Sequence, residues 1–169
     1  MASILPVRVR RGRLEFLFGK EKASDATPGW SDFGGGVDRG ESPREAAIRE
    51  AGEELTGFLG SRARVVRLVR EALVLQPLPT YTCHIIFLGE EDGDTDQLVL
   101  FFNRNAHYVH AHLDPAVIRR SKIFEKTQIR WFTLPEMAQQ RHLFRSFYRT
   151  IVDHLILHAP HILQHATSS

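Results

Sequence analysis

Apolar residues recur along the chain in short runs bounded by glycine, proline and charged residues. Runs of this kind, rich in β-branched and aromatic side chains, are typical of strands. They predict strands over residues 4–9, 14–18, 65–75, 81–88, 98–102 and 128–133. Arg11-Gly12-Arg13 is suited to the turn of a first hairpin, and residues 76–80, with two prolines, separate a second antiparallel pair.

The clearest helix start along the chain is a capping box. Ser42 is suited to the N-cap, Pro43 to the first helical position, and Glu45 stands three residues after Ser42. The helix is expected to run from Pro43 to about Leu55 and to stop at Gly57, a residue suited to a left-handed cap.

A second helix is predicted near the C-terminus. Pro135 opens a segment that is expected to stay helical to about residue 160. An apolar stripe at helical spacing supports it. Its members are Phe144, Phe147, Ile151 and Leu155.

Two stretches separate the predicted elements. Residues 21–40, rich in Gly, Asp, Ser and Pro, read as a loop. Residues 103–122 are expected to form an irregular insertion, with one helical turn after Asp114-Pro115. A mixed sheet with a helix on each side follows, so the predicted fold class is an α/β/α sandwich, as one domain over residues 1–169.

The composition excludes a disordered or fibrous chain. Hydrophobic residues make up 43% and charged residues 25% of the 169 residues, close to the globular average. No apolar run reaches the roughly 18 residues of a spanning helix, and the apolar start is too short for a signal peptide. A single cysteine, Cys83, excludes an internal disulfide and a zinc cage of thiolates. We therefore expect a cytoplasmic protein without a membrane partner.

The formal net charge of +2 conceals an asymmetry. Residues 1–98 hold 13 Lys or Arg and 16 Asp or Glu, a net of −3, whereas residues 99–169 hold 9 and 4, a net of +5. Eight of the nine histidines also lie in the second part. An acidic half beside a basic half suits a metal site that faces a polyanion, and an ordinary charged surface gives the same counts.

Three carboxylates crowd one face of the first predicted helix. At about 100° per residue, Glu53 and Glu54 fall on either side of Glu50, opposite the apolar face that packs on the sheet. Like charges within one turn repel one another. Mg²⁺ or Mn²⁺ relieves the repulsion because hard divalent cations prefer oxygen ligands. The pattern alone also suits a solvated acidic face, so the neighbouring residues decide.

Those neighbours resemble the signature of the Nudix hydrolases. The signature is Gly, five residues, Glu, seven residues, Arg-Glu, two residues, Glu-Glu, one residue and Gly. Gly35, Glu41, Arg49-Glu50 and Glu53-Glu54 match it at the right spacing, within a box over residues 35–57. The order of strands and helices extends the resemblance over most of the chain. The resemblance implies the Nudix-type α/β/α sandwich and a pyrophosphohydrolase that depends on Mg²⁺ or Mn²⁺.

Metal ligands are the first roles that the resemblance implies. Glu50, Glu53 and Glu54 correspond to side-chain ligands, and the carbonyl of Gly34 or Gly35 to a backbone ligand. Glu53 and Glu54 are therefore also expected to be catalytic.

Further acidic residues have implied roles around this centre. Glu41 corresponds to a loop carboxylate that pairs with Arg49 and supports the site structurally. Glu125 corresponds to a loop glutamate that binds a further metal ion or acts as the base. The alternative for Glu125 is a loop carboxylate paired with Lys126 or Arg130, and Glu54 is the other candidate base.

The sequence departs from the family pattern at two places. Thr56 stands where the family has glycine, with Gly57 one place later, which predicts one extra helical residue before the cap. Asp32-Phe33 stands where Phe-Pro is common, so Asp32 either caps a turn, our preferred interpretation, or adds charge near the metals.

The basic C-terminal half predicts a substrate with more charge than a plain diphosphate bridge. Capped RNA, dinucleoside polyphosphates and diphosphoinositol polyphosphates fit, and residues 29–36 resemble Nudix proteins of large DNA viruses, some of which act on mRNA caps. The candidate substrate-binding residues are Arg104, His107, Arg119, Arg120, Lys122 and, by stacking on a base, Trp30.

Other functions remain open at this point. One alternative is a housekeeping pyrophosphatase for nucleoside triphosphates or nucleotide sugars. Another is a non-catalytic nucleotide sensor, although such proteins usually lose some of the glutamates that this chain keeps. The expected partner is a phosphorylated nucleotide-type substrate, with RNA as one form, and the protein is expected to be a monomer or a homodimer.

Overall fold

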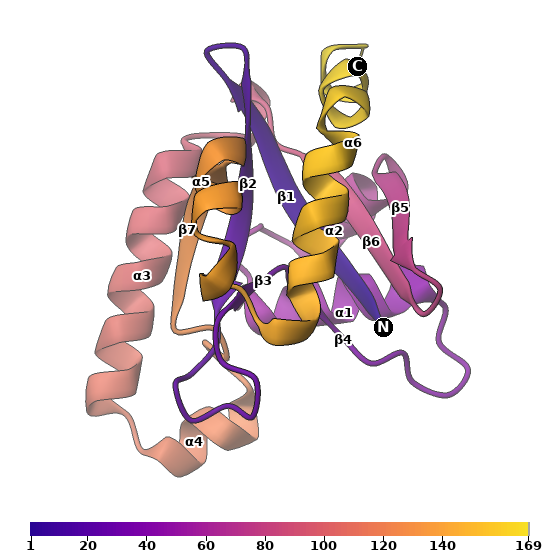
Figure 1. Ribbon diagram of the computed structural model, residues 1–169. Coiled ribbons are helices and arrows are strands. Elements are labelled where there is room, and N and C mark those ends of the chain that lie inside the picture. The colour runs from indigo at the N-terminus through magenta and orange to yellow at the C-terminus, as the bar shows by residue number, and fades with distance from the viewer. Residues whose placement is uncertain (169) are drawn as a thin grey trace.

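The computed structural model describes residues 1–168 and places helices on both faces of a seven-stranded sheet (Figure 1). The strands are β1 (Ala2–Arg10), β2 (Arg13–Lys20), β3 (Trp30–Ser31), β4 (Phe33–Gly35), β5 (Leu73–Leu78), β6 (Tyr81–Phe87) and β7 (Gln128–Thr133). The helices are α1 (Pro43–Glu54), α2 (Arg62–Arg70), α3 (Thr95–His112), α4 (Pro115–Ser121), α5 (Leu134–Gln139) and α6 (Arg149–Ser168). Short 3₁₀ segments cover Glu90–Asp92, Arg141–Leu143 and Ser146–Tyr148.

The central strand β1 gives the sheet its mixed character. β1 runs antiparallel to β2 and β4 and parallel to β6, in the order β3-β2-β1-β6-β5, with β7 beside β2. Its first residues pair with β4, where Ser3 lies opposite Gly34, and its last residues pair with β2, where Val9 lies opposite Leu14. The glycines of β4 therefore lie at the N-terminal end of β1, where α1 also packs.

Two apolar cores, one on each face of the sheet, complete the architecture. The first joins the sheet to α1, α2 and α3 and contains Leu55 and Phe102. The second lies under α5 and α6 and contains Phe132, Ile151 and Leu155. The predicted α/β/α sandwich with a mixed sheet is confirmed.

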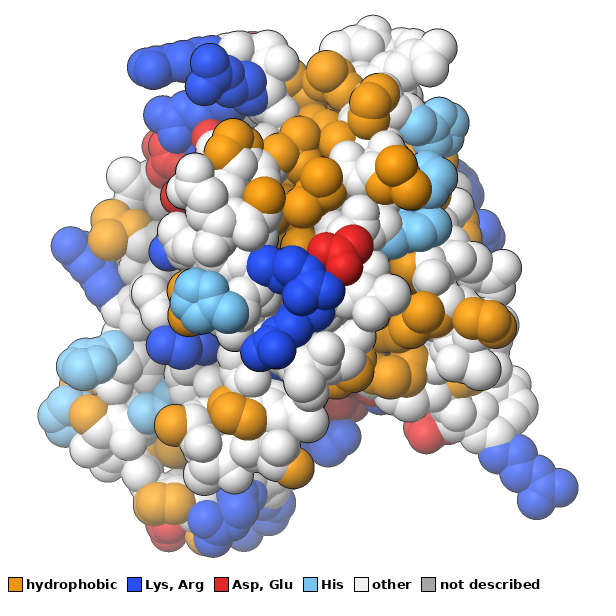
Figure 2. All heavy atoms as spheres, viewed as in Figure 1, with side chains coloured by type: hydrophobic (Ala, Val, Ile, Leu, Met, Phe, Trp, Pro, Cys, Tyr) orange, Lys and Arg blue, Asp and Glu red, His pale blue; other side chains and the backbone are white. Residues whose placement is uncertain are grey.

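Histidine side chains gather along α6 on the face of the molecule that Figure 2 shows. His154 and His158 lie one helical turn apart, with 4.1 Å between their ring centroids. Because α1 packs on the opposite face of the sheet, these histidines lie away from residues 50–54.

Most of the local predictions agree with the structure. The strands predicted at residues 4–9, 14–18, 81–88 and 128–133 and the helix from Pro43 are confirmed within a few residues. The predicted loop over residues 21–40 differs, because it contains the short strands β3 and β4.

The strand predicted over residues 65–75 is wrong in its first half. Residues 65–70 belong to α2, and the strand begins only at Leu73. Val65, Leu68 and Val69 are buried at spacings of three and four, the period of a helix face. Their β-branched composition favoured a strand, and packing against α1 and β6 overrides it.

The strand predicted over residues 98–102 and the irregular insertion over residues 103–122 are also wrong. Both fall largely within α3, which is 18 residues long. Phe102 and Ala106 are buried one helical turn apart and anchor α3 on the sheet. The helical turn expected after Asp114 is confirmed as α4.

The helix predicted from Pro135 to about residue 160 is broken in two. Residues between α5 and α6 form 3₁₀ turns and extended backbone, in which Phe144 bridges to Trp30. Ile151 and Leu155 do form a buried stripe on α6. None of the helices within residues 1–168 combines the length and the apolar character that a bilayer crossing requires.

Candidate active site

The N-terminus of α1 fixes where this helix begins; because α1 carries Glu50, Glu53 and Glu54, we call it the acidic helix. The Ser42 hydroxyl accepts the backbone N–H of Glu45 at 3.3 Å, and the Glu45 carboxylate accepts the backbone N–H of Ser42 at 2.8 Å. This capping box, followed by Pro43, satisfies donors that have no partner inside the helix. The helix therefore begins at the predicted residue, and every later side chain has a defined direction.

Arg49 binds the loop between β4 and α1, which contains Gly36 and Glu41, to the acidic helix. Its guanidinium donates to both carboxylate oxygens of Glu41, at 3.1 and 3.0 Å, and to the carbonyl of Gly36 at 3.0 Å. Hydrogen bonds from Arg49 lower the pKa of Glu41, so this carboxylate stays ionised. These contacts hold the backbone at Gly36 and the Glu41 loop against α1, and the role of the pair in supporting a catalytic site stays a prediction.

The two glycines of β4 lie too close to their neighbours to carry a side chain. A Cβ at Gly34 would lie 2.4 Å from the Cβ of Ser3, and one at Gly35 would lie 2.4 Å from Oε1 of Glu50. Glycine therefore lets the strand approach both the sheet and the acidic helix. The Glu50 carboxylate is left directly against the backbone of Gly35.

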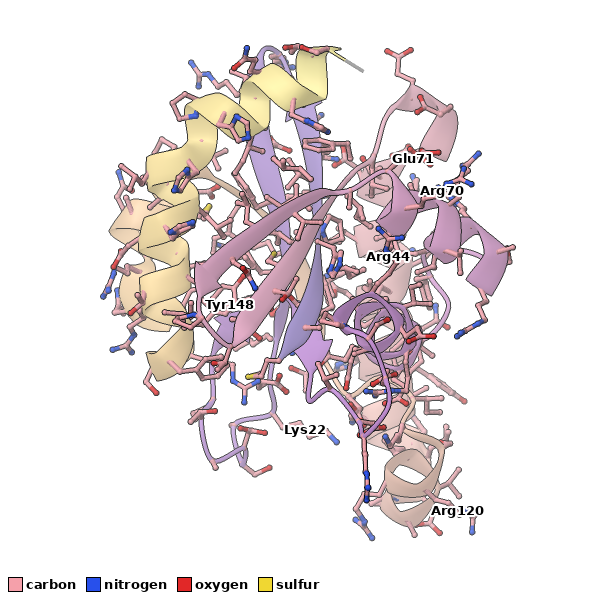
Figure 3. All side chains as sticks on the ribbon, turned by 90° about the vertical axis from the view of Figure 1, so that its right-hand side faces the viewer. Lys22, Arg44, Arg70, Glu71, Arg120 and Tyr148 are labelled. Atoms are coloured by element: carbon pink, nitrogen blue, oxygen red, sulfur yellow. The ribbon has the colours of Figure 1, made fainter. Side chains whose placement is uncertain are left out.

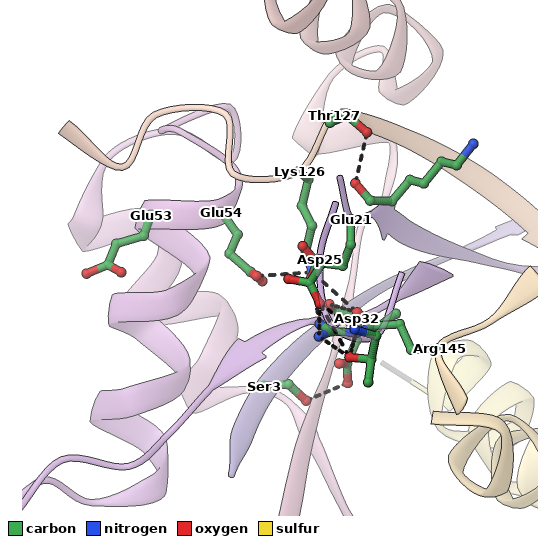
Figure 4. A network of polar contacts seen from close by, with 12 residues as sticks. Ser3, Glu21, Asp25, Asp32, Glu53, Glu54, Lys126, Thr127 and Arg145 are labelled. Atoms are coloured by element: carbon green, nitrogen blue, oxygen red, sulfur yellow. Dashed lines mark hydrogen bonds and ion pairs between the residues drawn. The ribbon is translucent and has the colours of Figure 1, made fainter. Parts of the chain in front are cut away.

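Three glutamates of the acidic helix each have a different cation as their nearest ionic partner. Glu50 accepts from Arg49 at 2.7 Å, Glu53 from Lys122 at 2.9 Å and Glu54 from Lys126 at 3.0 Å. Glu53 and Glu54 point in different directions from α1 (Figure 4). Within residues 1–168, no three His, Cys, Asp or Glu side chains converge on one point.

Glu54 does not face away from the core as the helical wheel predicts. Its residue exposure is 5%, and its Oε2 atom is buried without a hydrogen-bond partner within residues 1–168. Burial raises the pKa of Glu54 to about 8, although the nearby Lys126 ammonium opposes the rise. A buried carboxylate with an unsatisfied oxygen is costly unless a cation or a donor reaches it.

A buried charge network behind α1 was not anticipated from the sequence. Lys126 is fully buried and pairs with Glu54 and with Glu21 (Figure 4). Glu21 also accepts from Arg145 at 2.7 Å, which in turn donates to Asp25 at 3.2 Å. The network joins the loop after β2, the loop before β7 and the segment before α6. Its partners lie up to 124 residues apart, so no local pattern could have revealed it.

Glu125 is half-buried and has neither of the partners that the alternative interpretation required. Lys126 turns inward instead, and Arg130 lies 3.7 Å from the ring centroid of Phe132. Burial raises the pKa of Glu125, Lys122 opposes the rise, and the charge of Glu53 adds to it. Glu125 makes no hydrogen bond or ion pair with the described residues. It lines a surface pocket with Glu21, Lys22, Ser24, Asp25, Ile118, Arg119 and Ile123.

The predicted substrate-binding residues fall into two groups. Lys122 and Arg119 lie near the acidic helix or the Glu125 pocket. Arg120 is exposed near the end of α4 (Figure 3), and Arg104 and His107 are exposed on α3.

Trp30 lies in the core rather than on a surface open to a base. Its exposure is 5%, and its ring packs edge-on against Phe132 with 5.1 Å between the ring centroids. The guanidinium of Arg130 lies 5.5 Å from the Trp30 ring centroid. The ring therefore has little free surface for a stacked base.

Asp32 neither caps a turn nor faces the acidic helix. It is 2% exposed and accepts hydrogen bonds of 2.5 Å from both Ser3 and Tyr81. Burial raises its pKa, while these two hydrogen bonds oppose the rise. Both interpretations offered for Asp32 from the sequence are wrong, because the side chain turns into the sheet between β1 and β6.

The donor set around α1 fits a hard divalent cation. The ligands on offer are carboxylate and carbonyl oxygens, which Mg²⁺ and similar ions prefer. Glu54 brings a buried oxygen that has no hydrogen-bond partner among residues 1–168, and Gly35 lets Glu50 and the backbone approach each other closely. A cation would satisfy the buried Glu54 oxygen and could bind between the Glu50 carboxylate and the nearby backbone.

An α/β/α sandwich that brings a glycine strand against a carboxylate-rich helix is the arrangement that the sequence signature implies, that of hydrolases acting on pyrophosphate bonds. The model of the NUDIX domain matches residues 2–155 of the chain. The protein belongs to the Nudix family, whose members are hydrolases of this kind and generally need divalent metal ions. A comparison with curated protein sequences gives no match.

Proposed function

We propose that this protein is a Mg²⁺- or Mn²⁺-dependent pyrophosphohydrolase that cleaves a nucleoside diphosphate linked to another group. The observation that carries the proposal is the close approach of the Glu50 carboxylate to the Gly35 backbone. A second carboxylate on the same helix, Glu54, has a buried oxygen that no donor within the described residues satisfies. Membership of the Nudix family supports the reaction class.

The acidic helix supplies the cation site in this proposal. Glu50, Glu53 and Glu54, with the carbonyl of Gly34 or Gly35, would hold the ion. When bound, a divalent cation neutralises the diphosphate and lowers the pKa of a coordinated water. Lys122 is exposed and flexible, so it can leave Glu53 and bind a substrate phosphate instead.

Glu125 is the better-placed base, with Glu54 as the other candidate. One oxygen of Glu54 is bound to Lys126, and the whole side chain is buried. Glu125 lines an open pocket and is not hydrogen-bonded within residues 1–168. A carboxylate placed in this way can take a proton from an attacking water.

The Glu125 pocket also supports a substrate with several charges. Lys22 and Arg119 add cations to its lining, and Ile118 and Ile123 add apolar surface. Two of the carboxylates in the lining, Glu21 and Asp25, are already paired with Arg145. This combination suits a phosphate chain that carries a base or a sugar. Capped RNA, a dinucleoside polyphosphate and a diphosphoinositol polyphosphate are the proposed substrates, and ADP-ribose is the less charged comparison.

A substrate panel tests the proposal. The full chain is incubated with Mg²⁺ or Mn²⁺ and, in turn, with capped RNA, diadenosine polyphosphates, diphosphoinositol polyphosphates, nucleoside triphosphates and ADP-ribose. Metal-dependent release of nucleotide or phosphate, with higher kcat/KM for the more charged compounds, is expected. Binding without turnover of any compound would contradict the proposal that the protein is an enzyme. A preference for ADP-ribose or triphosphates would contradict the proposed preference for highly charged substrates.

A further inference from the structure

A buried lysine lies directly behind the acidic helix. The side chain of Lys126 has no solvent exposure. Its ammonium contacts Oε1 of Glu54 at 3.0 Å, the Glu21 carboxylate and, at 3.3 Å, the hydroxyl of Ser31. An ammonium has three protons to donate, so these partners account for its full bonding capacity.

The sheet is shaped to admit the stem of this lysine. A Cβ at Gly19 in β2 would lie 2.7 Å from Cγ and 2.9 Å from Cδ of Lys126. Any other residue at this position would displace the stem. The position of the Lys126 side chain is therefore fixed by packing against Gly19 as well as by its ion pairs.

Lys126 acts on one side of the Glu54 carboxylate. The Oε1 atom carries the ion pair, while Oε2 is buried without a hydrogen-bond partner within the described residues. A carboxylate held at one oxygen has a fixed plane, and its other oxygen then has a fixed direction. Hydrogen bonds to metal-binding side chains orient ligands in this manner.

The lysine also connects α1 to the pocket that contains Glu125. Glu21, its second carboxylate partner, lines that pocket together with Asp25, and Arg145 binds both of them. The network contains three carboxylates and two cations, so with all five groups ionised it carries one formal negative charge in excess. That excess favours a further cation beside Glu54.

We propose that Lys126 is a positioning residue. Its ammonium, which is paired with Glu21, holds one oxygen of the Glu54 carboxylate so that the other oxygen is free to bind a divalent cation. The inference rests on the proposed function, because it assigns Glu54 to the cation site. Lys126 itself touches neither the cation nor the substrate.

Mn²⁺ binding to the protein without substrate tests this role. Lys126→Met removes the ammonium and keeps an unbranched stem, and Lys20→Met removes a neighbouring exposed lysine as the matched control. Free Mn²⁺ is followed by electron paramagnetic resonance. We expect Lys126→Met to weaken Mn²⁺ binding by about 10–100-fold and to lower kcat with little change in KM, while Lys20→Met behaves like the wild type.

A second variant guards against a folding failure. Glu21→Gln keeps the size of the side chain that contacts Lys126 and removes its charge. It therefore weakens the hold on Lys126 without leaving two buried carboxylates unpaired. Folding of each variant is checked by circular dichroism. Weaker Mn²⁺ binding by folded Glu21→Gln supports the proposal, and wild-type binding by either folded variant overturns it.

The two proposals fail in different ways. If the wild type neither binds Mn²⁺ nor cleaves any diphosphate, the proposed function is wrong. If the wild type does both and Lys126→Met matches it, only the positioning role of Lys126 is wrong.

Discussion

The hydroxyl of Thr56 accepts a hydrogen bond of 2.8 Å from the backbone N–H of Phe124. Thr56 has a φ of +50°, the left-handed conformation that glycine adopts most easily. It is therefore not the extra helical residue expected from the sequence, since α1 ends at Glu54. The threonine takes a left-handed backbone shape that glycine adopts most easily, and its hydroxyl holds the loop that carries Glu125.

Thr56→Gly separates these two roles. Relief of the left-handed backbone gains about 1 kcal/mol, and loss of the hydrogen bond removes a similar amount. We expect the free energy of unfolding in urea to change by less than about 1 kcal/mol, while kcat falls because the Glu125 loop loosens. Thr56→Ser keeps the hydroxyl and should retain kcat. Unchanged kcat in the glycine variant would show that the tether does not serve Glu125.

Glu53→Gln and Glu54→Gln should both lower turnover by at least about 10²-fold, because each removes a charge from the proposed cation site. Their effects on stability should differ. Glu53 pairs with the exposed Lys122, so its loss should change the unfolding free energy by less than about 0.5 kcal/mol. Glu54 pairs with the buried Lys126, so its loss should cost about 1–3 kcal/mol. Thermal unfolding and Mg²⁺-dependent kinetics measure the two effects, and equal stability of both variants would contradict the buried pair.

Local signals account for what the sequence predicted well. The capping box at Ser42 and the spacing from Gly35 to Glu54 act over one loop and one helix, so their geometry can be worked out residue by residue. The Glu41–Arg49 pair was expected from the resemblance to the Nudix signature, and the structure contains this pair. Helices α2 and α3 were missed because β-branched and aromatic residues favour strands locally, and only contacts with the sheet decide otherwise.

The long-range part of the site was beyond a single sequence. Lys126 joins Glu54 and Glu21 across 72 and 105 residues, and an isolated lysine beside Glu125 reads as a surface residue. Asp32 was placed in a turn because Asp is common there. Its burial depends on Ser3 and Tyr81, which only the pairing of β1 with β6 brings together.

Asp32 should make stability depend on pH. Burial raises the pKa of this carboxyl in the folded state, so the folded protein holds a proton that the unfolded chain has released. Unfolding free energy should therefore fall as pH rises from about 4 through the raised folded pKa. Asp32→Asn should flatten this part of the stability curve, measured by urea unfolding at several pH values. An unchanged slope would mean that Ser3 and Tyr81 fully offset the burial.

Glu125→Gln tests the proposed base. A residue that takes a proton in the transition state, or binds a further metal ion, should affect kcat more than KM. We expect kcat to fall by about 10²-fold or more, with little change in the unfolding free energy because Glu125 forms no ion pair or hydrogen bond with residues 1–168. Steady-state kinetics on the best substrate decide the matter. If kcat stays at the wild-type value, Glu125 belongs to the surface loop and Glu54 becomes the base.

Arg119 should raise affinity in proportion to substrate charge. It lines the pocket with Glu125, whereas Arg120, near the end of α4, does not line it and Arg70 lies on α2 (Figure 3). Arg119→Ala should raise KM for a capped RNA or a polyphosphate substrate several-fold more than for ADP-ribose. It should also reduce the salt dependence of KM, because salt screens charge pairs on the surface. Arg120→Ala should have a smaller effect, and Arg70→Ala provides the control for the loss of an exposed arginine. Equal KM changes for both substrate types in the Arg119 variant, with unchanged salt dependence, would remove the electrostatic reason for a polyanionic substrate.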